Sequence, residues 1–434
     1  MLKNYFKTSA AINIFANSIG IVFLTGLSYL IISTAENVPV WDAWHNPRLF
    51  DLMFSGKLKF SDLYEEANGH RLLFPKIITL TLGYFSHYDV RWELLVNITL
   101  GATIFFLFKI FLADKLKQNN AIYFGAISCI SILVFSLVQY ENWYCGWQIC
   151  IFLCIATSLL SLAILVLAKK SYINLLFAMV SAVIATYSFA NGLIVWPLGA
   201  LVLLCQKKSK GFAVAWLASA ALFSFLYFYH FESSANFHIT NLPEHIIYFL
   251  AYVGAPLAIE SYFKAIIWAA AGLVVFIYLC WLAVKTATLR RHNLLLMVIC
   301  VFSLASGLLI SVARLGFGME YALLSRYTSF SGLFWVSLCL MVFSRISVTP
   351  EVFEKKAAWF FVAMVLISSL RCSLIVKDEF DLHKRRMLLA INELKKEDLQ
   401  NTRREAVKNI TWDVDFTLEQ AQILKKYKLS LYAE

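Results

Sequence analysis

A succession of apolar runs constrains this chain more than any other feature of its sequence. The first, AINIFANSIGIVFLTGLSYLIIS at residues 11–33, contains no Asp, Glu, Lys or Arg. At about 23 residues it is long enough to cross a bilayer, and because it lacks a clear small-residue cleavage site we interpret it as a retained first helix. The runs predict transmembrane helices at roughly 11–33, 92–113, 121–138, 148–168, 172–188, 191–206, 211–229, 262–284, 294–312, 330–345 and 357–374. We therefore expect an all-α polytopic membrane protein with about eleven transmembrane helices.

The composition supports a membrane protein and argues against a nucleic-acid partner. Hydrophobic residues make up 60% of the chain, charged residues only 15%, and the mean hydropathy is +0.69. Soluble proteins average about 45–50% apolar and about 25% charged residues. The net charge of +11 comes from short Lys and Arg clusters between apolar runs, so it indicates topology rather than nucleic-acid binding. The nine cysteines lie almost all within or beside the apolar runs, which is typical of small core residues.

The basic clusters alternate along the chain as the positive-inside rule requires. With the N-terminus in the cytoplasm, each cytoplasmic loop is basic, at Lys115 and Lys117, Lys169 and Lys170, residues 207–210, residues 285–292, and Arg345 with residues 354–356. The opposite face receives the loops at 34–91, 139–148, 187–192, 230–261 and 313–329 and the tail at 375–434. Nearly all conspicuous polar residues therefore lie on this outer face.

The first outer loop, residues 34–91, gathers polar groups that the rest of the chain avoids. It contains VPVWDAWHNPRLFDLMFSGKLKFSDLYEEANGHRLLFPK at 38–76, in which a turn separates two amphipathic pieces that we expect to lie along the membrane interface. Asp42 stands between two tryptophans near the end of the first helix. A partly desolvated carboxylate there has the setting of a general base, and the alternative is an N-cap for a helix that begins at Pro47.

The order of these pieces resembles the first outer loop of the GT-C superfamily, the integral-membrane glycosyltransferases that take sugars from polyprenyl-phosphate carriers. The matching pieces are Asp42 with His45, PRLFDLMFSGKL, and HRLLFPKIITLTLGYF ahead of RWELLVNITLGATIFFLF, so the likeness in layout covers roughly residues 10–115. More loosely, the chain is similar to bacterial and phage O-antigen-modifying glucosyltransferases. The resemblance implies a bundle in the bacterial inner membrane whose active site faces the periplasm.

The resemblance also implies a second catalytic acid, and Glu141 in VQYENWYCGWQI occupies its place. The surrounding aromatic residues, including Trp143, suit the face of a sugar ring, whereas the alternative is a solvated helix cap. The sequence WDAWH lacks the Asp-Glu pair of many members. His45 therefore replaces the second acid, binds a divalent metal such as Mg²⁺ or Mn²⁺ with Asp42, or only forms local hydrogen bonds. No cofactor is required by the sequence.

A lipid-phosphate donor needs cations near the outer interface. The candidates are Arg71 and Lys76 in the first outer loop, and Arg314 and Arg326 in SVARLGFGMEYALLSRYTSF; the alternative for the arginines is contact with lipid headgroups. The candidates for substrate binding are Trp41, His45, Glu66, His70, Trp143 and Tyr327.

These residues predict a transferase with a transmembrane domain at 1–374 and a small helical segment outside the membrane at 375–434, for which we favour a structural role over substrate binding. Asp42 would activate an acceptor hydroxyl, and Arg71 or Arg326 would stabilise the leaving lipid phosphate. The expected partners are a polyprenyl-phosphate sugar, a glycan or lipid-linked acceptor, and membrane lipid. A polysaccharide polymerase and a lipid or oligosaccharide transporter are the alternatives.

Overall fold

The computed structural model describes residues 2–112, 114–206, 209–231, 242–285, 291–396 and 402–433. Within them the chain is helical apart from a single hairpin, β1 (Glu66–Ala67) and β2 (His70–Arg71). Parts of two predicted basic loops, at 207–208 and 286–290, lie outside the described residues. So does part of the predicted outer segment, at 232–241. The prediction of an all-α polytopic membrane protein is confirmed.

Nine helical stretches within the described residues are long and apolar enough to cross a bilayer. They contain α1 (Leu2–Thr34), α5 (Arg91–Phe111), α7 (Asn120–Val134), α9 (Ile149–Leu167), α12 (Lys210–Phe228), α14 (Tyr262–Lys285), α15 (Arg291–Arg314), α16 (Thr328–Ile346) and α17 (Val352–Val376). The other two predicted runs form shorter apolar helices, α10 (Tyr172–Thr186) and α11 (Val195–Cys205). Nine segments rather than eleven thus have the length of a crossing helix. A further short helix, α6 (Asp114–Gln118), precedes α7.

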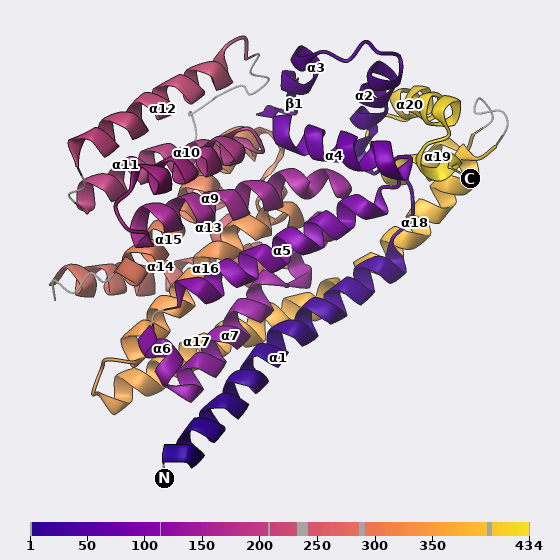
Figure 1. Cartoon of the computed structure of the whole chain (residues 1–434). Coiled ribbons are helices and arrows are strands. Elements are labelled where there is room, and N and C mark those ends of the chain that lie inside the picture. Colours follow the sequence, from indigo (N-terminus) through magenta and orange to yellow (C-terminus); the bar gives the residue numbers. More distant parts are fainter. Residues whose placement is uncertain are drawn as a thin grey trace.

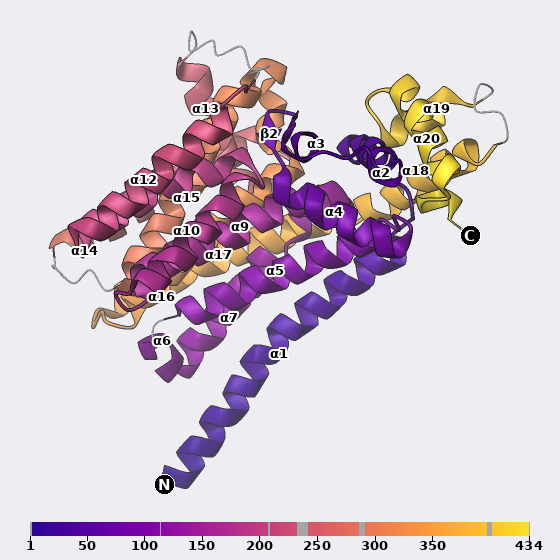
Figure 2. The same ribbon diagram turned by 45° about the horizontal axis from the view of Figure 1, so that its top comes forward.

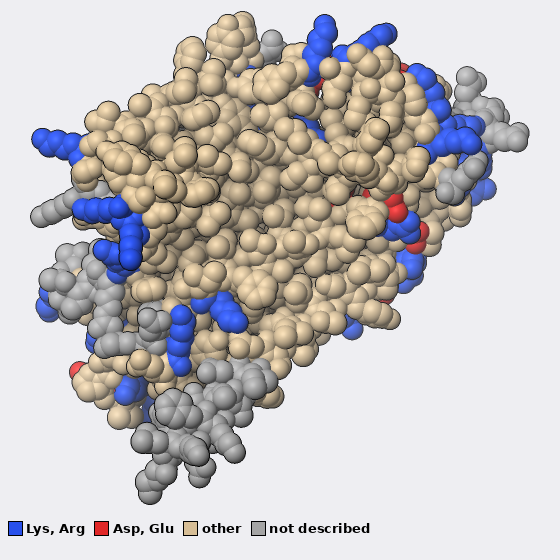
Figure 3. All heavy atoms as spheres, in the orientation of Figure 1, with Lys and Arg blue, Asp and Glu red and all other residues tan. Residues whose placement is uncertain are grey.

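The long helices run side by side, and the N- and C-termini lie at opposite ends of the bundle (Figures 1 and 2). The segment at 34–91 and the C-terminal helices gather at one end, which we call the loop end. On the face in Figure 3, Lys and Arg lie toward the ends and edges of the molecule, with a broad uncharged surface between them. Such a surface is expected for helices that contact lipid tails.

The segment at 34–91, called the first loop below, folds into short helices across the loop end. These are η1 (Trp41–His45), α2 (Asn46–Phe54), α3 (Phe60–Tyr64) and α4 (Leu73–Ser86), so the two expected amphipathic pieces form α2 and α4. Pro47 lies in the first turn of α2, where a missing N–H costs nothing. The N-cap residue of α2 is His45, without a side-chain cap, so the alternative role of Asp42 as that cap is wrong.

The C-terminal segment is helical, as predicted, and shares a hydrophobic core with the first loop. It contains α18 (Glu379–Leu394), α19 (Arg404–Val407) and α20 (Val414–Tyr427). Trp44 and Phe50 of the first loop belong to the same buried cluster as Leu394 and Leu424. At its edge, the Asp51 carboxylate accepts from Lys426 Nζ and from the Tyr427 hydroxyl, both at 2.9 Å. The two segments therefore form one unit at the loop end.

One helix, α13 (Leu242–Gly254), was not predicted and lies within the region assigned to an outer segment. Its Tyr248 and Tyr252 side chains are fully buried, and Trp335 Nε1 of α16 donates to the Val253 carbonyl oxygen at 2.7 Å. At about 20 Å long, a helix of this length is too short to cross the bilayer. It instead packs beside α14 and α15.

We expect the substitution Leu424→Ala to loosen the C-terminal segment and the first loop together. Leu424 is fully buried in their shared core, and truncation of a buried leucine costs about 2–5 kcal/mol. Limited proteolysis in detergent should show faster cleavage in both segments. Leu389→Ala, at a position 56% exposed on α18, is the matched control. Faster cleavage in the C-terminal segment alone would contradict a shared core.

Candidate functional site

Glu141 and Arg326 form an ion pair at the loop end. Glu141 lies in the short helix α8 (Tyr140–Tyr144), and Arg326 lies in the turn η8 (Ser325–Tyr327) that leads into α16. Arg326 Nε is 3.3 Å from Glu141 Oε2, and the Arg326 backbone N–H donates to the same oxygen at 2.9 Å. The side chain of Arg326 is 18% exposed and that of Glu141 is 9% exposed. A predicted catalytic acid and a predicted phosphate ligand are therefore partners.

The guanidinium of Arg326 forms no hydrogen bond with any described residue. Its Nε atom is within ion-pair distance of Glu141, but it is buried and has no hydrogen-bond partner among the described residues. The ring of Trp41 lies 5.8 Å from the guanidinium carbon. Because unpaired buried donors are costly, and because Arg suits oxyanions, this guanidinium is a favourable place for an anionic ligand.

Buried amides hold the Glu141–Arg326 pair in place. Asn142 Nδ2 donates to the Arg326 carbonyl at 2.9 Å and to Ser329 Oγ at 2.6 Å, which ties α8 to the start of α16. Asn97 Nδ2 of α5 donates to the carbonyls of Asn142 and Cys145, at 3.1 and 3.0 Å. These bonds give hydrogen-bond donors to backbone carbonyl groups outside the long helices, which inside a membrane protein have little water to bind.

Asp42 lies near this pair, on the first loop. Its side chain is half-buried, makes no hydrogen bond or ion pair with a described residue, and lies close enough to Arg326 for their charges to interact. The preceding residue, Trp41, has a φ of 52°, a left-handed conformation that is strained for a bulky residue. Such strain is held only where the surrounding structure imposes it, and it is frequent at functional sites.

His45 faces aromatic rings rather than a second acid. Its ring centroid is 4.9 Å from that of Phe416 and 6.3 Å from that of Trp147. Desolvation lowers the pKa of His45, and the neighbouring Asp42 opposes this shift. Among the described residues, no group of three or more His, Cys, Asp or Glu side chains is arranged to hold a metal ion. The predicted metal alternative thus has only Asp42 and His45 to supply ligands.

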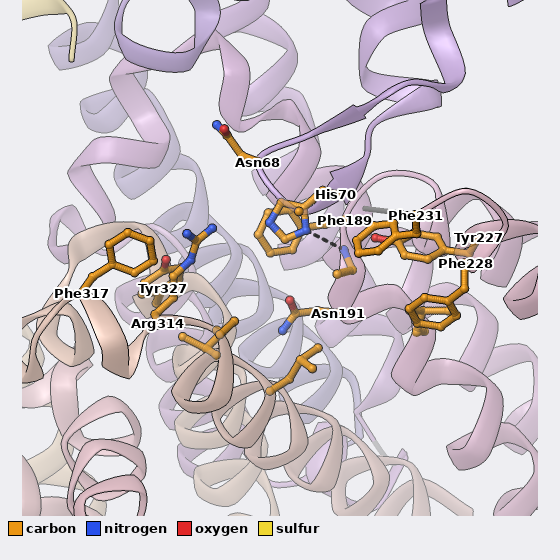
Figure 4. A pocket seen from close by; sticks show the side chains of 16 residues that line it. Asn68, His70, Phe189, Asn191, Tyr227, Phe228, Phe231, Arg314, Phe317 and Tyr327 are labelled. Carbon is orange, nitrogen blue, oxygen red and sulfur yellow. Dashed lines mark hydrogen bonds between the residues drawn. The ribbon is translucent and has the colours of Figure 1, made fainter. Parts of the chain in front are cut away.

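A cavity of about 220 Å³ lies at the loop ends of α12 and α15, beside Tyr327 of η8. Figure 4 shows three predicted residues, His70, Arg314 and Tyr327, on its wall. Its other lining residues are mostly apolar or aromatic: Asn68, Gly69, Phe189, Ala190, Asn191, Leu193, Tyr227, Phe228, Phe231, Leu309, Ile310, Ala313 and Phe317. Phe228 and Phe317 are more than half exposed, so the apolar wall continues onto the surface of the bundle.

A tight hairpin places His70 at this cavity. Asn68 and Gly69 both have positive φ, as a two-residue Asn-Gly turn requires, and His70 follows directly in β2. The His70 ring stacks on Phe189 at 3.9 Å, and His70 Nδ1 accepts from the Ala190 N–H at 3.3 Å. Burial, with a contribution from Arg314, lowers the pKa of His70 to about 3. The ring is therefore neutral near pH 7, and Nε2 carries its proton as a donor.

Arg314 brings the positive charge to the cavity. It ends α15, is half-buried, and forms no ion pair with a described carboxylate. Its guanidinium lies beside the Tyr327 hydroxyl (Figure 4). The buried Asn191 Nδ2 also lacks a hydrogen-bond partner among the described residues. Since Tyr327 directly follows Arg326, the short turn η8 connects the cavity to the Glu141–Arg326 pair.

Two other predicted phosphate ligands are engaged by backbone carbonyls. Arg71 donates to the carbonyls of Tyr227, Tyr64 and Tyr229, at 2.6, 2.7 and 2.5 Å. Lys76 Nζ donates to two carbonyls of the first loop, and burial lowers the pKa of Lys76 to about 8. Arg71 thereby ties the first loop to the end of α12, and Lys76 ties α4 to the end of α3 within the first loop. These bonds leave both side chains few donors for a ligand.

Trp143 departs from its predicted position against a sugar ring. Its side chain is fully buried, Nε1 donates to the Ser136 carbonyl at 3.0 Å, and the ring stacks on Phe152 at 4.5 Å. Gly101 of α5 makes room for it, because a Cβ there would lie 2.7 Å from the ring. Glu66 lies in β1, paired with Arg71 across the hairpin.

Sequence analysis missed Phe189 and Asn191 at the cavity. They belong to the YSFANG turn, which was assigned to the outer face but carried no charge that pointed to a site. The Asn-Gly dipeptide at 68–69 was a usable signal, since it predicts the hairpin that positions His70.

No known protein family, no curated protein and no solved structure matches this chain.

We expect Glu141→Gln to destabilise the protein by about 3 kcal/mol, because it leaves the Arg326 charge buried without compensation. The thermal unfolding midpoint in detergent measures this. Adding Arg326→Met should recover part of the loss, and Glu320→Gln, at an exposed position in the same region, is the control. A variant as stable as wild type would show that the pair contributes nothing to folding.

Proposed function

We propose that this protein is a membrane glycosyltransferase that moves a hexosyl group from a polyprenyl-phosphate donor to a cell-surface glycan such as O-antigen. The supporting observation is the guanidinium of Arg326, whose buried Nε atom has no hydrogen-bond partner among the described residues and whose charge interacts with both Glu141 and the half-buried Asp42. A cation with free donors suits a phosphate, and a nearby carboxylate suits a general base. The loop end faces the periplasm of the bacterial inner membrane in this proposal.

The cavity beside η8 suits the donor. Its walls are largely apolar and continue onto the lipid-facing surface at Phe228, which fits a polyprenyl chain that enters from the bilayer. Arg314 and the neutral His70 supply a positive charge and an N–H donor at the same place. A phosphate there would be bound by charge-assisted hydrogen bonds in surroundings with little water, where such bonds are strong.

The reaction needs one base and stabilisation of one leaving group. The acceptor O–H proton moves to the Asp42 carboxylate as the acceptor oxygen bonds to the anomeric carbon. The bond between that carbon and the phosphate oxygen breaks, and its electron pair leaves with the polyprenyl phosphate. Arg326 and Arg314 stabilise the negative charge that develops on this phosphate. Glu141 acts here as a positioning residue, because its carboxylate holds Arg326.

The layout of the first loop is consistent with a GT-C-like bundle. An acidic residue after the first span is followed by the interfacial helices α2 and α4 and then by the next span, α5. With the short helices α10 and α11 counted as crossings, the bundle would have about eleven spans.

We expect Asp42→Asn to abolish sugar transfer while donor binding is retained. Loss of a general base lowers rates by roughly 10²–10⁴-fold. The measurement is transfer of labelled sugar from synthetic polyprenyl-phosphate hexoses to surface polysaccharide, in membranes that contain each variant. Asp381→Asn, at an exposed position on α18 of the same unit, is the matched control.

Wild-type rates from the Asp42→Asn variant would exclude Asp42 as the base. No transfer by wild type with any of several hexoses would contradict the transferase and favour the polymerase or transporter.

We expect Arg314→Gln to raise the KM for the donor about tenfold, with a smaller effect on the KM for the acceptor, since a charged phosphate contact is worth roughly 1.5–3 kcal/mol. Arg314→Lys should be intermediate because lysine keeps the charge but loses the planar fork. Arg48→Gln, an exposed arginine of α2, should leave both constants unchanged. An unchanged donor KM in Arg314→Gln would place the donor phosphate elsewhere.

A further inference from the structure

Trp412 is the most exposed tryptophan among the described residues, at 69%. It lies between η10 (Lys408–Ile410) and α20, in the C-terminal segment. Its ring stacks on Trp41, with centroids 6.1 Å apart and planes inclined by 24°. Trp41 is in turn the neighbour of Asp42, so the C-terminal segment brings a large exposed ring next to the proposed base.

The backbone around Trp412 is held in place on both sides. Thr411 Oγ1 accepts from the Asp413 N–H at 3.1 Å and from the Thr417 hydroxyl at 2.7 Å. The Asp413 carboxylate caps α20 by accepting from the Phe416 N–H at 3.1 Å. Because these hydrogen bonds hold the turn, the exposed indole of Trp412 is pre-organised. Binding a ligand there therefore costs little conformational entropy.

Trp412 is part of a larger aromatic surface beside Asp42. We call this surface the aromatic shelf; it consists of Trp412, Trp41, Phe416, His45 and Trp147. Two ring contacts join η1 to the C-terminal segment, Trp41 with Trp412 and His45 with Phe416, and His45 also contacts Trp147. Trp412 and His45 are exposed and the other three rings are partly exposed. Exposed clusters of large apolar side chains mark binding sites.

Polar groups beside the shelf suit a saccharide. Asp413 and Glu419 are exposed on the same turn and helix, and carboxylates accept hydrogen bonds from sugar hydroxyls. The C–H face of a pyranose ring is apolar and flat, so it packs against an indole face while its hydroxyls reach the neighbouring polar groups.

We propose that Trp412 and Trp41 form a subsite for the acceptor saccharide, in which a sugar ring of the acceptor lies on the aromatic shelf with its hydroxyl directed toward Asp42. This inference rests on the proposed transferase function and gives the C-terminal segment a role in acceptor binding beyond its structural one. Trp412 is not among the residues that line the cavity beside η8, so we expect its substitution to leave donor binding unchanged.

The test compares Trp412→Ala, Trp412→Phe and wild type in the labelled-sugar assay, with surface polysaccharide purified from the producing cells as acceptor. Trp412→Ala should raise the acceptor KM about tenfold and leave the donor KM unchanged, whereas Trp412→Phe should retain most of the wild-type affinity. Trp92→Ala, which removes another exposed tryptophan at the start of α5, is the matched control and should change neither constant.

A second measurement needs no turnover. The same polysaccharide should protect Trp412 from oxidation by N-bromosuccinimide, followed by mass spectrometry, and polyprenyl phosphate should not. An unchanged acceptor KM in an active Trp412→Ala enzyme overturns the subsite while the transferase stands. If wild type transfers no sugar, the transferase fails, and absence of protection then overturns saccharide binding as well. Quenching of Trp412 by brominated lipids in reconstituted vesicles would overturn the subsite in favour of a membrane contact.

Discussion

The buried pairing of Arg326 with Glu141 is the interaction on which the loop end of the bundle depends. Two charges withdrawn from water are stable only if each compensates the other and the surrounding dipoles are satisfied. The Asn142 amide meets this need by binding the Arg326 carbonyl and Ser329 Oγ. The pair thereby joins α8 to the beginning of α16, two segments about 185 residues apart in the sequence.

This requirement explains why helices break where they do. The long helices are interrupted at 135–148, where the short helix α8 forms, and again at 315–327, and both interruptions lie at the loop end. Non-helical backbone at membrane depth is tolerated where protein covers it or where it lines a cavity. In this chain it does both, because η8 carries Arg326 toward Glu141 and Tyr327 toward the cavity. The short turn η8 thus contributes one residue to the ion pair, Arg326, and one to the cavity, Tyr327.

The spans and the first-loop helices were predictable because length and apolar character suffice to identify them, as α2 and α4 show. Glu141 and Arg326 were each predicted as candidate site residues, because both are charged residues at the outer ends of apolar runs. Their pairing was not, because no local pattern reports a contact between such distant segments. Residue type also failed to separate Arg71, whose side chain donates to three backbone carbonyls, from Arg326, whose buried Nε atom has no hydrogen-bond partner among the described residues.

Aromatic residues gave the least reliable signal. Trp143 lies among other rings in the sequence and is fully buried, whereas Trp412 stands alone in a charged tail and is exposed beside Trp41. A tryptophan's sequence neighbours do not reveal which of its faces is covered; in this fold the shared core of the first loop and the C-terminal segment decides that.

The position of Trp41 depends on contacts between the beginning of the chain and its C-terminal segment. Lys384 of α18 donates to the Ser33 carbonyl at the end of α1, at 2.8 Å, and lies 3.9 Å from Glu36. These contacts fix the start of the first loop, and with it Trp41, relative to α18. Because α18 follows α17 after only two residues, the position of Trp412 is tied to a membrane-spanning helix rather than to a flexible tail. In the transferase that we propose, the C-terminal segment holds the acceptor at a fixed distance from Asp42, which is what a transfer reaction between a lipid and a polymer requires.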